Sequence, residues 1–444
     1  MRQLLFTLFV SRALLGISAS SFGDNVTGEV VNLEVKPIIF LPTLPEAKVF
    51  GEQGELKYCG GLQLSSGNSA FGGLSGVILL HNGSRLLAVE DVGRWFSATL
   101  HYTKDGHLNN LSDALLGPLL DAEGDSLIGK ELGDAESIIA SGHTDDLDFL
   151  ISFERRHRIW RYHLEGGGSG PMHALAQPVA NVTDYILQAG CEENGGMEAI
   201  ALLADGGLLV FCEKPPPSTD AIHVVPGWVF DVQQGEAPQK LFLDCKEDGW
   251  YPTDLATLPG GDVLVLQRFY SRAKGSAMRL RRLKQEDICD GVTLEGKLIA
   301  EFSAADGFAI DNMEGAAVFV HDTWGTRLLI VSDDNFSPSQ QTVLHMFQLS
   351  ESHRNRSEDT WAAPPSSEQE AHDETRDNRF ILLCTIYTLT TMSATCIAVL
   401  TLRKWYSWRK EDWYRQMEPS IQLRGTSGDE DMAADLPAQP YADM

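Results

Sequence analysis

Short apolar runs recur along residues 30–350, and each of them ends in polar or charged residues. The runs follow turns that contain glycine, and they read RLLAVED (85–91), DFLISFERR (148–156), GLLVFCEK (207–214), DVLVLQR (262–268) and RLLIVSDD (327–334). Runs of this length bounded by turns are typical of β-strands. Ahead of each run, a small or acidic residue begins another apolar stretch; these lead positions are Ser75, Glu136, Glu198, Asp254 and Glu314. Their intervals of 61, 62, 56 and 60 residues predict a structural repeat.

A repeat of this length, built from short strands and turns, is typical of the blades of a β-propeller. The repeats contain no long segment with a 3.6-residue apolar period, which argues against a helical solenoid. Five units are visible, and residues 30–60 together with 341–349 can form a closing blade from both ends of the domain. We therefore expect an all-β, five- or six-bladed, propeller-like ectodomain over residues 24–350, with a pair of β-sandwiches as the alternative.

The N-terminal residues have the layout of a secretory signal peptide. A basic Arg2 precedes an apolar stretch that ends at small residues near Ser20. Because Arg12 interrupts that stretch and no acidic residue precedes Asp24, a mitochondrial transit peptide is the minor alternative. Sequons for N-glycosylation favour secretion; they begin at Asn25, Asn82, Asn110, Asn181, Asn335 and Asn355. Residues 1–20 are therefore predicted to be a signal peptide.

An uncharged apolar segment at residues 380–402 is long enough to cross a bilayer as a single transmembrane helix. It follows a polar stretch, residues 351–378, with the composition of a flexible stalk, which makes a buried core helix the less favoured alternative. Arg403 and Lys404 come directly after it, so the positive-inside rule places residues 403–444 in the cytoplasm as a tail. The sequence thus predicts a single-pass type I membrane protein with an extracellular or lumenal ectodomain.

The net charge and the cysteine content indicate which partners, disulfides and metal sites to expect. The formal net charge of −27 over 444 residues argues against a nucleic-acid partner, because phosphate backbones bind Lys/Arg surfaces. Five cysteines precede the predicted span, and their proximity in sequence suggests two disulfides, Cys191 with Cys212 and Cys245 with Cys289. The sequence contains neither a Cys-x-x-Cys pair nor a His-Glu-x-x-His run, so it gives no support for a zinc site.

The recurring carboxylates are the candidate chemistry. If every unit begins at the same place in its blade, Glu136, Glu198, Asp254 and Glu314 form a ring around one end of the channel, which Ser75 breaks. The strand ends add further charged residues, which are Glu90, Asp91, Arg94, Glu154, Arg155, Arg268, Asp333 and Asp334. Crowded carboxylates suit Ca²⁺ or Mg²⁺, and a cation beside arginines would attract a phosphorylated or other anionic small molecule. The alternative is structural, with the acids capping strands and holding blades in register.

Two other motifs are weaker. Residues 124–130 resemble a phosphate-binding loop, but Glu131 stands where a Ser or Thr would bind Mg²⁺. Ser75 is a conceivable esterase nucleophile, yet its surroundings lack the second glycine of a nucleophile elbow and it has no assignable histidine partner.

Several of these segments together resemble one known family. The segments at 72–77 (GGLSGV), 134–138 (DAESI), 152–162, 194–200 (NGGMEAI), 251–271, 311–318 (DNMEGAAV) and 328–349 are similar to the phytase-like domain family, also described as esterase-like activity of phytase. The resemblance implies a propeller-like fold and a phosphoesterase activity carried by Glu136, Glu154, Glu198, Asp254, Glu314, Asp333 and Asp334.

The residues and the resemblance lead to one principal expectation. We expect a membrane-anchored, divalent-cation-dependent phosphoester hydrolase in which Glu136, Glu198, Asp254 and Glu314 are catalytic. Arg155 and Arg268 would bind the anionic substrate, and Glu154, Asp333 and Asp334 would bind Ca²⁺ or Mg²⁺. The alternative is a non-enzymatic surface propeller that binds a protein, a glycan or a small ligand.

Overall fold

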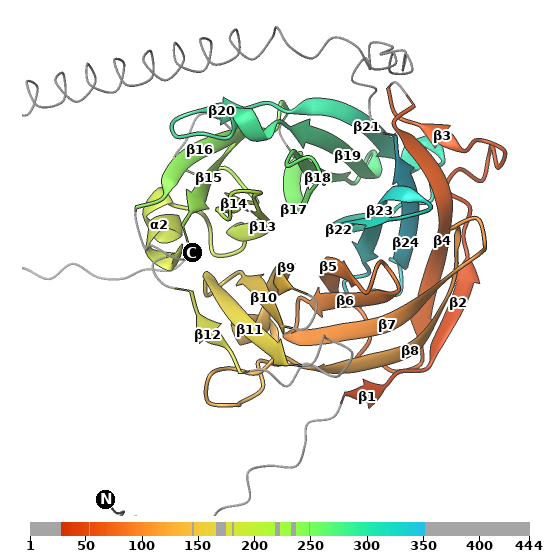
Figure 1. Ribbon diagram of the computed structural model, residues 1–444, viewed down its shortest axis with the longest axis horizontal. Coiled ribbons are helices and arrows are strands. Elements are labelled where there is room, and N and C mark those ends of the chain that lie inside the picture. Colours follow the sequence, from red (N-terminus) through yellow and green to blue (C-terminus); the bar gives the residue numbers. More distant parts are fainter. Residues whose placement is uncertain are drawn as a thin grey trace, which may run out of the picture. The chain divides into compact units, whose positions relative to one another are not determined.

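The chain folds into five β-sheets arranged around a central axis, as the blades of a propeller (Figure 1). The computed structural model describes residues 28–350, apart from 53, 144–145, 166–174, 180–181, 218–222, 232–236 and 248. The predicted signal peptide, stalk, transmembrane helix and cytoplasmic tail lie outside the described residues. The prediction of five or six blades is thus confirmed as five, and the alternative of two β-sandwiches is wrong.

Each blade begins at its innermost strand and proceeds outward. The first sheet holds β5 (Leu74–Leu80), β6 (Arg85–Glu90), β7 (Arg94–Tyr102), β8 (Leu108–Pro118) and β1 (Glu29–Val30). The second holds β9 (Ala135–His143), β10 (Asp146–Phe153), β11 (Arg158–Glu165) and β12 (Gln177–Pro178). The third holds β13 (Met197–Leu202), β14 (Leu208–Cys212), β15 (Val224–Phe230), β16 (Gln239–Asp244) and β20 (Thr293–Leu294). The fourth holds β17 (Tyr251–Thr257), β18 (Val263–Ser271), β19 (Gly275–Leu283) and β21 (Lys297–Ser303).

The fifth blade joins the two ends of the domain and closes the ring. Its inner strands are β22 (Asn312–His321), β23 (Gly325–Asp333) and β24 (Thr342–Leu349), and its outer strands are β4 (Leu56–Ser66) and β2 (Leu33–Pro37). Strand β3 (Val49–Phe50) pairs with β4. The antiparallel pairing of β24 with β4, in which Leu344 faces Leu62, confirms the closing blade predicted from both ends.

Helices are few and short in the described part of the chain. They are α1 (Lys130–Gly133), α2 (Val182–Ala189) and the 3₁₀ turns at Gln285–Asp287 and Ala304–Asp306. No helix among the described residues is long and apolar enough to span a membrane.

Five hydrophobic clusters stabilise the ring, and each one lies between two adjacent sheets. The second strand of each blade is therefore covered on both faces. In β6, for example, Leu86, Leu87, Ala88 and Val89 are all buried. This two-sided burial explains why the sequence shows continuous apolar runs instead of the alternation of a half-exposed strand.

The inner strands pack so closely that they leave little room for side chains along the axis. A Cβ atom on Gly76 would lie 2.5 Å from the Cα of Ser137 in the second blade. A Cβ on Gly315 would lie 2.3 Å from the carbonyl oxygen of Ser75 in the first blade. Glycine is required at both positions because neighbouring backbones occupy that space.

One disulfide prediction is confirmed and the other is wrong. Cys191 and Cys212 form a disulfide that ties the segment after α2 to the end of β14. Cys245 and Cys289 are both free thiols; Cys245 is buried directly after β16, and Cys289 is exposed. Proximity in sequence does not fix connectivity in a sheet structure, where the strand register decides which Cα atoms approach.

Candidate functional site

A polar cavity of about 140 Å³ opens at the end of the propeller where the inner strands begin. It is lined by Ser75, Asp91, Lys130, Asp134, Glu136, Glu154, Asn194, Glu198, Glu213, Arg268, Asn312, Glu314, Asp333 and Asn335. Eight of these side chains are carboxylates, and only Lys130 and Arg268 are cationic. Three of the four acids predicted to form a ring, Glu136, Glu198 and Glu314, line this cavity together with five further carboxylates.

A β-bulge at the start of each inner strand places the first ring of side chains. Pairing between the first two strands of a blade shifts by an extra residue at Ser75, Glu136, Glu198, Thr253 and Glu314. A bulged residue is left out of the ladder, so its side chain can be directed differently from its neighbours. Four of the five bulged residues, all except Thr253, line the cavity.

Asp254, which was predicted to be catalytic, lies one residue beyond the bulge and does not line the cavity. Its carboxylate accepts hydrogen bonds from Ser137 Oγ at 2.7 Å in the second blade and from the amide of Ala316 at 2.8 Å in the fifth. Burial raises the pKa of Asp254 to about 8, although these hydrogen bonds act in the opposite direction. The contacts assign Asp254 the structural role of linking three blades across the central channel.

Replacing Asp254 should therefore affect stability strongly. Asp254→Ala leaves the amides of Ala316 and Leu255 without their buried acceptor, and we expect a loss of roughly 2–4 kcal/mol in the free energy of unfolding. Asp254→Asn keeps one acceptor oxygen and should lose less. Urea unfolding of the purified variants measures both values. An Asp254→Ala protein as stable as the wild type would show that the acid has no such linking role.

A second ring comes from the ends of the second strands. Asp91, Glu154, Glu213, Arg268 and Asp333 occupy equivalent positions in the five blades and all line the cavity. The sequence predicted charged residues at these strand ends, because each apolar run ends in charge. The fourth blade differs from the others because Arg268 stands where each of the other blades has an acid in this second ring, which places a cationic group on that side of the cavity.

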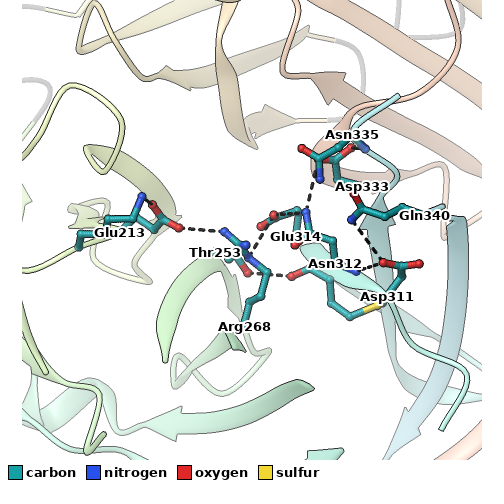
Figure 2. Close-up of polar contacts among 11 residues, drawn as sticks. Glu213, Thr253, Arg268, Asp311, Asn312, Glu314, Asp333, Asn335 and Gln340 are labelled. Atoms are coloured by element: carbon teal, nitrogen blue, oxygen red, sulfur yellow. Dashed lines mark hydrogen bonds and ion pairs between the residues drawn. The ribbon is translucent and has the colours of Figure 1, made fainter. Parts of the chain in front are cut away.

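Cationic side chains hold several of the cavity carboxylates in place. Arg268 lies between Glu213 and Glu314, with N–O distances of 2.9 and 3.2 Å (Figure 2). Lys130 Nζ lies 2.6 Å from Asp91. Arg155, predicted to bind substrate, does not line the cavity and pairs with Asp134 at 2.7 Å. Arg155 therefore positions a cavity acid, whereas Arg268 and Lys130 reach the cavity itself.

The two predicted metal ligands of the fifth blade have different surroundings. Asp333 lines the cavity, and its carboxylate accepts hydrogen bonds from the amide of Asn335 at 2.6 Å and from Asn312 Nδ2 at 3.5 Å. Figure 2 shows Asn312 between Glu314 and Asp333, within a polar network that continues to Asp311. Asp334 does not line the cavity, because its Oδ1 accepts from the amides of Gly73 and Phe336. Asp334 thus holds a turn.

Crowding and burial raise the pKa values of these acids. Burial raises the pKa of Glu154 to about 8, with the negative charge of Glu213 as the next cause. Burial and the carboxylates around them also raise the pKa values of Glu136 and Glu198 well above the ordinary range. Arg268 lowers the pKa of Glu314, yet burial still holds it at about 7. The cavity therefore holds protons at neutral pH that a bound cation would replace.

Two groups of carboxylates have the donor set for a metal ion. Oxygens of Asp134, Glu136 and Glu154 lie within 4.8 Å of one another, and so do oxygens of Glu154, Glu198 and Glu213. Glu154 belongs to both groups. Ca²⁺ and Mg²⁺ prefer carboxylate oxygens. Two further buried oxygens, Asp91 Oδ1 and Glu314 Oε2, have no hydrogen-bond partner among the described residues. These acidic groups fit a divalent cation.

Sequence reasoning missed several cavity residues for identifiable reasons. Lys130 was discounted with its false phosphate-loop motif, and Asp134 lies directly before the strand that carries Glu136. Asn194 reaches the cavity on the segment that the Cys191–Cys212 disulfide anchors. Glu213 was visible as the charged end of the run 207–214. Glu213 could have been predicted by considering, in every blade, the lead residue of the first strand together with the charged residue that ends the second strand.

Ser75 lines the cavity without the partner that an esterase of the predicted kind needs. None of the residues that line this cavity in the described structure is a histidine. Its neighbours in the cavity are carboxylates, amides and two cations, so the geometry favours cation and anion binding over a Ser-His nucleophile.

Comparisons with known proteins concern both sequence and fold. Residues 69–336 match the family described as phytase-like, esterase-like activity of phytase, and that range contains every cavity-lining residue. A search of curated proteins finds no match.

Several solved structures have similar folds, including the following three. A thermostable family-43 glycoside hydrolase is 10% identical, with 67% of this chain and 97% of that chain covered at a TM-score of 0.38. A β-xylosidase is 9% identical, with 66% and 94% covered at a TM-score of 0.39. AofleA from Arthrobotrys oligospora is 10% identical, with 67% and 82% covered at a TM-score of 0.32.

Proposed function

This chain belongs to the phytase-like family, and from that premise we propose that it is a membrane-anchored, divalent-cation-dependent phosphoester hydrolase. The observation that supports the proposal is the pair of carboxylate groups that share Glu154 beside Arg268. Sites that transfer phosphoryl groups commonly combine carboxylate-bound cations with fixed cationic side chains. The cavity contains both kinds of group.

A divalent cation bound by these carboxylates would polarise a phosphoryl oxygen and lower the pKa of a bound water. The chain's own residues supply binding and proton transfer. Arg268, fixed between Glu213 and Glu314, and Lys130, beside Asp91, would attract and orient the phosphate. Because the two carboxylates hold Arg268 in place, little conformational entropy is lost when the anion binds.

Glu314 suits the proton transfer that phosphoester hydrolysis requires. A general acid or base works best when its pKa lies near the working pH, and the pKa of Glu314 is raised to about 7. Asn312 Nδ2 donates to Glu314 Oε1 at 2.7 Å and fixes the carboxylate, while Glu314 Oε2 is left without a partner in the described structure. That oxygen could exchange a proton with water or with a leaving group.

The location remains part of the proposal. The predicted signal peptide at residues 1–20 and the predicted span at residues 380–402 support a type I protein whose cavity faces the extracellular or lumenal space. Free divalent cations are abundant outside the cell, which agrees with a cation-dependent site there.

The rival function is a non-enzymatic propeller that binds a protein, a glycan or a small ligand. One observation favours it: Lys130, Arg155, Lys214 and Arg268 already pair with cavity carboxylates or their neighbours. Such pairs could make the acids purely structural. Turnover separates the two functions, because only the hydrolase predicts a chemical product.

The pH dependence of stability tests the electrostatics of the cavity. The pKa values of Glu154 and Glu314 are raised in the folded chain from 4.5 to about 8 and about 7. Between pH 4.5 and 8 the folded state then binds more protons than the unfolded state, so stability falls as the pH rises. We expect the melting temperature in EDTA to decrease over this window. Excess Ca²⁺ binds the deprotonated acids and should reduce the decrease. A melting temperature in EDTA that rises steadily from pH 5 to 8 would contradict these pKa shifts.

Hydrolysis of a panel of phosphomonoesters and phosphodiesters, phytate included, tests the proposed function directly. The purified protein is assayed with Ca²⁺, Mg²⁺ or EDTA beside a Glu198→Gln/Glu314→Gln variant. Cation-dependent release of phosphate that the folded variant loses would support the hydrolase. If the folded protein turns over none of these esters, the binding propeller becomes the better hypothesis.

A further inference from the structure

The cavity is too small to enclose a whole organic phosphoester. Its volume of about 140 Å³ lies below the roughly 300–1,000 Å³ of sites that enclose drug-sized ligands. A charged head group such as a phosphate would occupy the space between the carboxylates and the cationic side chains. The organic part of the ligand must then lie at the mouth, so the residues at the rim decide which organic groups are accepted.

An exposed aromatic side chain stands at this rim. Phe336 directly follows the cavity-lining Asn335 and is 38% exposed. A Cβ atom placed on Gly73 would lie 2.5 Å from Phe336 Cε2 and 2.4 Å from Asp91 Oδ1. The edge of the Phe336 ring and Asp91 Oδ1 therefore both lie next to the backbone of Gly73. On its other side, the Asp91 carboxylate pairs with Lys130, so the ring and the ammonium group border one cavity acid.

The backbone holds Phe336 there at a conformational cost. Asn335 and Phe336 have φ angles of 48° and 51°, in the left-handed region that is unusual for a bulky residue. Asp333 accepts from the amide of Asn335, and Asp334 accepts from the amides of Phe336 and Gly73. The two acids thus fix the turn that presents the ring. Backbone strain that is held in place by several hydrogen bonds is often found at functional sites.

The segment around Lys130 also combines a charged cavity residue with exposed apolar side chains. Ile128 and Leu132 are 46% and 39% exposed, and they lie two residues before and after the cavity-lining Lys130. Burying such side chains against a ligand would be favourable.

We infer that Phe336 is a specificity-determining residue, an apolar platform on which the organic part of an anionic ligand lies while its phosphate enters the cavity. The inference rests on the proposed function, because that function supplies the phosphate in the cavity. It adds a ligand class: phosphoesters whose organic part presents an apolar or aromatic face next to the phosphate. The substrate preference then depends on a ring outside the carboxylate cavity.

Binding of two non-hydrolysable probes tests the inference without requiring turnover. The full chain in detergent is titrated calorimetrically with phenylphosphonate and with methylphosphonate in the presence of Ca²⁺. We expect the wild type to bind phenylphosphonate roughly fivefold more tightly, in the range of one aromatic contact. Phe336→Ala should remove this preference and leave the affinity for methylphosphonate unchanged, whereas Phe336→Tyr should keep it. Val320→Ala is the matched control, because Val320 is an exposed apolar residue at the opposite end of β22.

Phe336→Gly tests whether misfolding of Phe336→Ala explains its loss of preference. Glycine adopts a positive φ without strain, so this variant should be at least as stable as Phe336→Ala while losing the same preference. A preference that survives in Phe336→Ala, or an equal loss of affinity for both probes, would overturn the platform while leaving the proposed function standing. If neither probe binds the wild type, the phosphate cavity and the platform are both wrong.

Discussion

Glu154→Gln is expected to abolish cation-dependent turnover while leaving the fold intact. Glu154 is shared by both carboxylate groups, so its loss removes a charged ligand from each. We expect the affinity for Ca²⁺ to fall by roughly 100-fold or more and turnover to fall on the order of 1,000-fold. Glutamine keeps the size of the side chain and an oxygen that can accept from the amide of Gly196, which now donates to Glu154 at 2.7 Å.

Stability should move in the opposite direction from activity in this variant. Because the pKa of Glu154 is raised to about 8, the neutral glutamine removes a destabilising negative charge above neutral pH. The melting temperature in EDTA at pH 8 should therefore be equal to that of the wild type or higher. Glu123→Gln, in an exposed loop, is the control and should change neither property. Full activity in a folded Glu154→Gln protein would exclude the shared carboxylate from catalysis.

Arg268→Gln is expected to be the most destabilising single change at the cavity. The side chain of Arg268 is 23% exposed and neutralises Glu213 and Glu314 together. Removing one member of a buried ion-pair group leaves charges uncompensated, which typically costs about 3–5 kcal/mol. Arg268 also lowers the pKa of Glu314, so that carboxyl takes up a proton more readily in the variant. The loss of stability should therefore be larger at pH 8 than at pH 5.

A double variant and a surface control separate this effect from general damage. Arg268→Gln/Glu314→Gln should regain part of the lost stability, because one of the unpaired charges is gone. Arg156→Gln breaks the exposed pair with Glu131 at 2.8 Å, outside the cavity, and should cost less than about 1 kcal/mol. Urea unfolding of the wild type and of these three variants, at both pH values, measures the free energies of unfolding. Equal stability of Arg268→Gln and wild type at pH 8 would show that the ion pairs contribute nothing.

The repeat could be predicted from sequence because the propeller imposes it. Every blade buries its second strand on both faces, so the runs at 85–91 and 327–334 are continuously apolar and end where the cavity begins. The same geometry places Glu154 and Asp333 at equivalent strand ends. Spacing alone was thus enough to bring Glu136, Glu198 and Glu314 together.

The spacing of the repeats does not determine which residue of a strand faces the cavity, because a shift of one residue changes the direction of the side chain. The bulge in the fourth blade falls on Thr253, so Asp254 is directed into contacts with the second and fifth blades instead of the cavity. Arg155 and Asp334 are adjacent in sequence to cavity residues, but a one-residue step along a strand end turns a side chain away. Lys130 enters the cavity from the first residue of α1, between the first and second blades, where the strand repeat gives no signal.

Calorimetric titration of the metal-free protein with Ca²⁺ and Mg²⁺, in buffers of different ionisation enthalpy, tests the carboxylate cavity most directly. If the two groups that share Glu154 hold divalent cations, binding is saturable and releases protons near pH 7, since the pKa values of Glu154 and Glu314 lie at about 8 and about 7. Glu154→Gln then binds far more weakly. Heats that show no saturable binding up to millimolar cation, in a protein confirmed to be folded, would contradict a cation-dependent hydrolase built on this cavity.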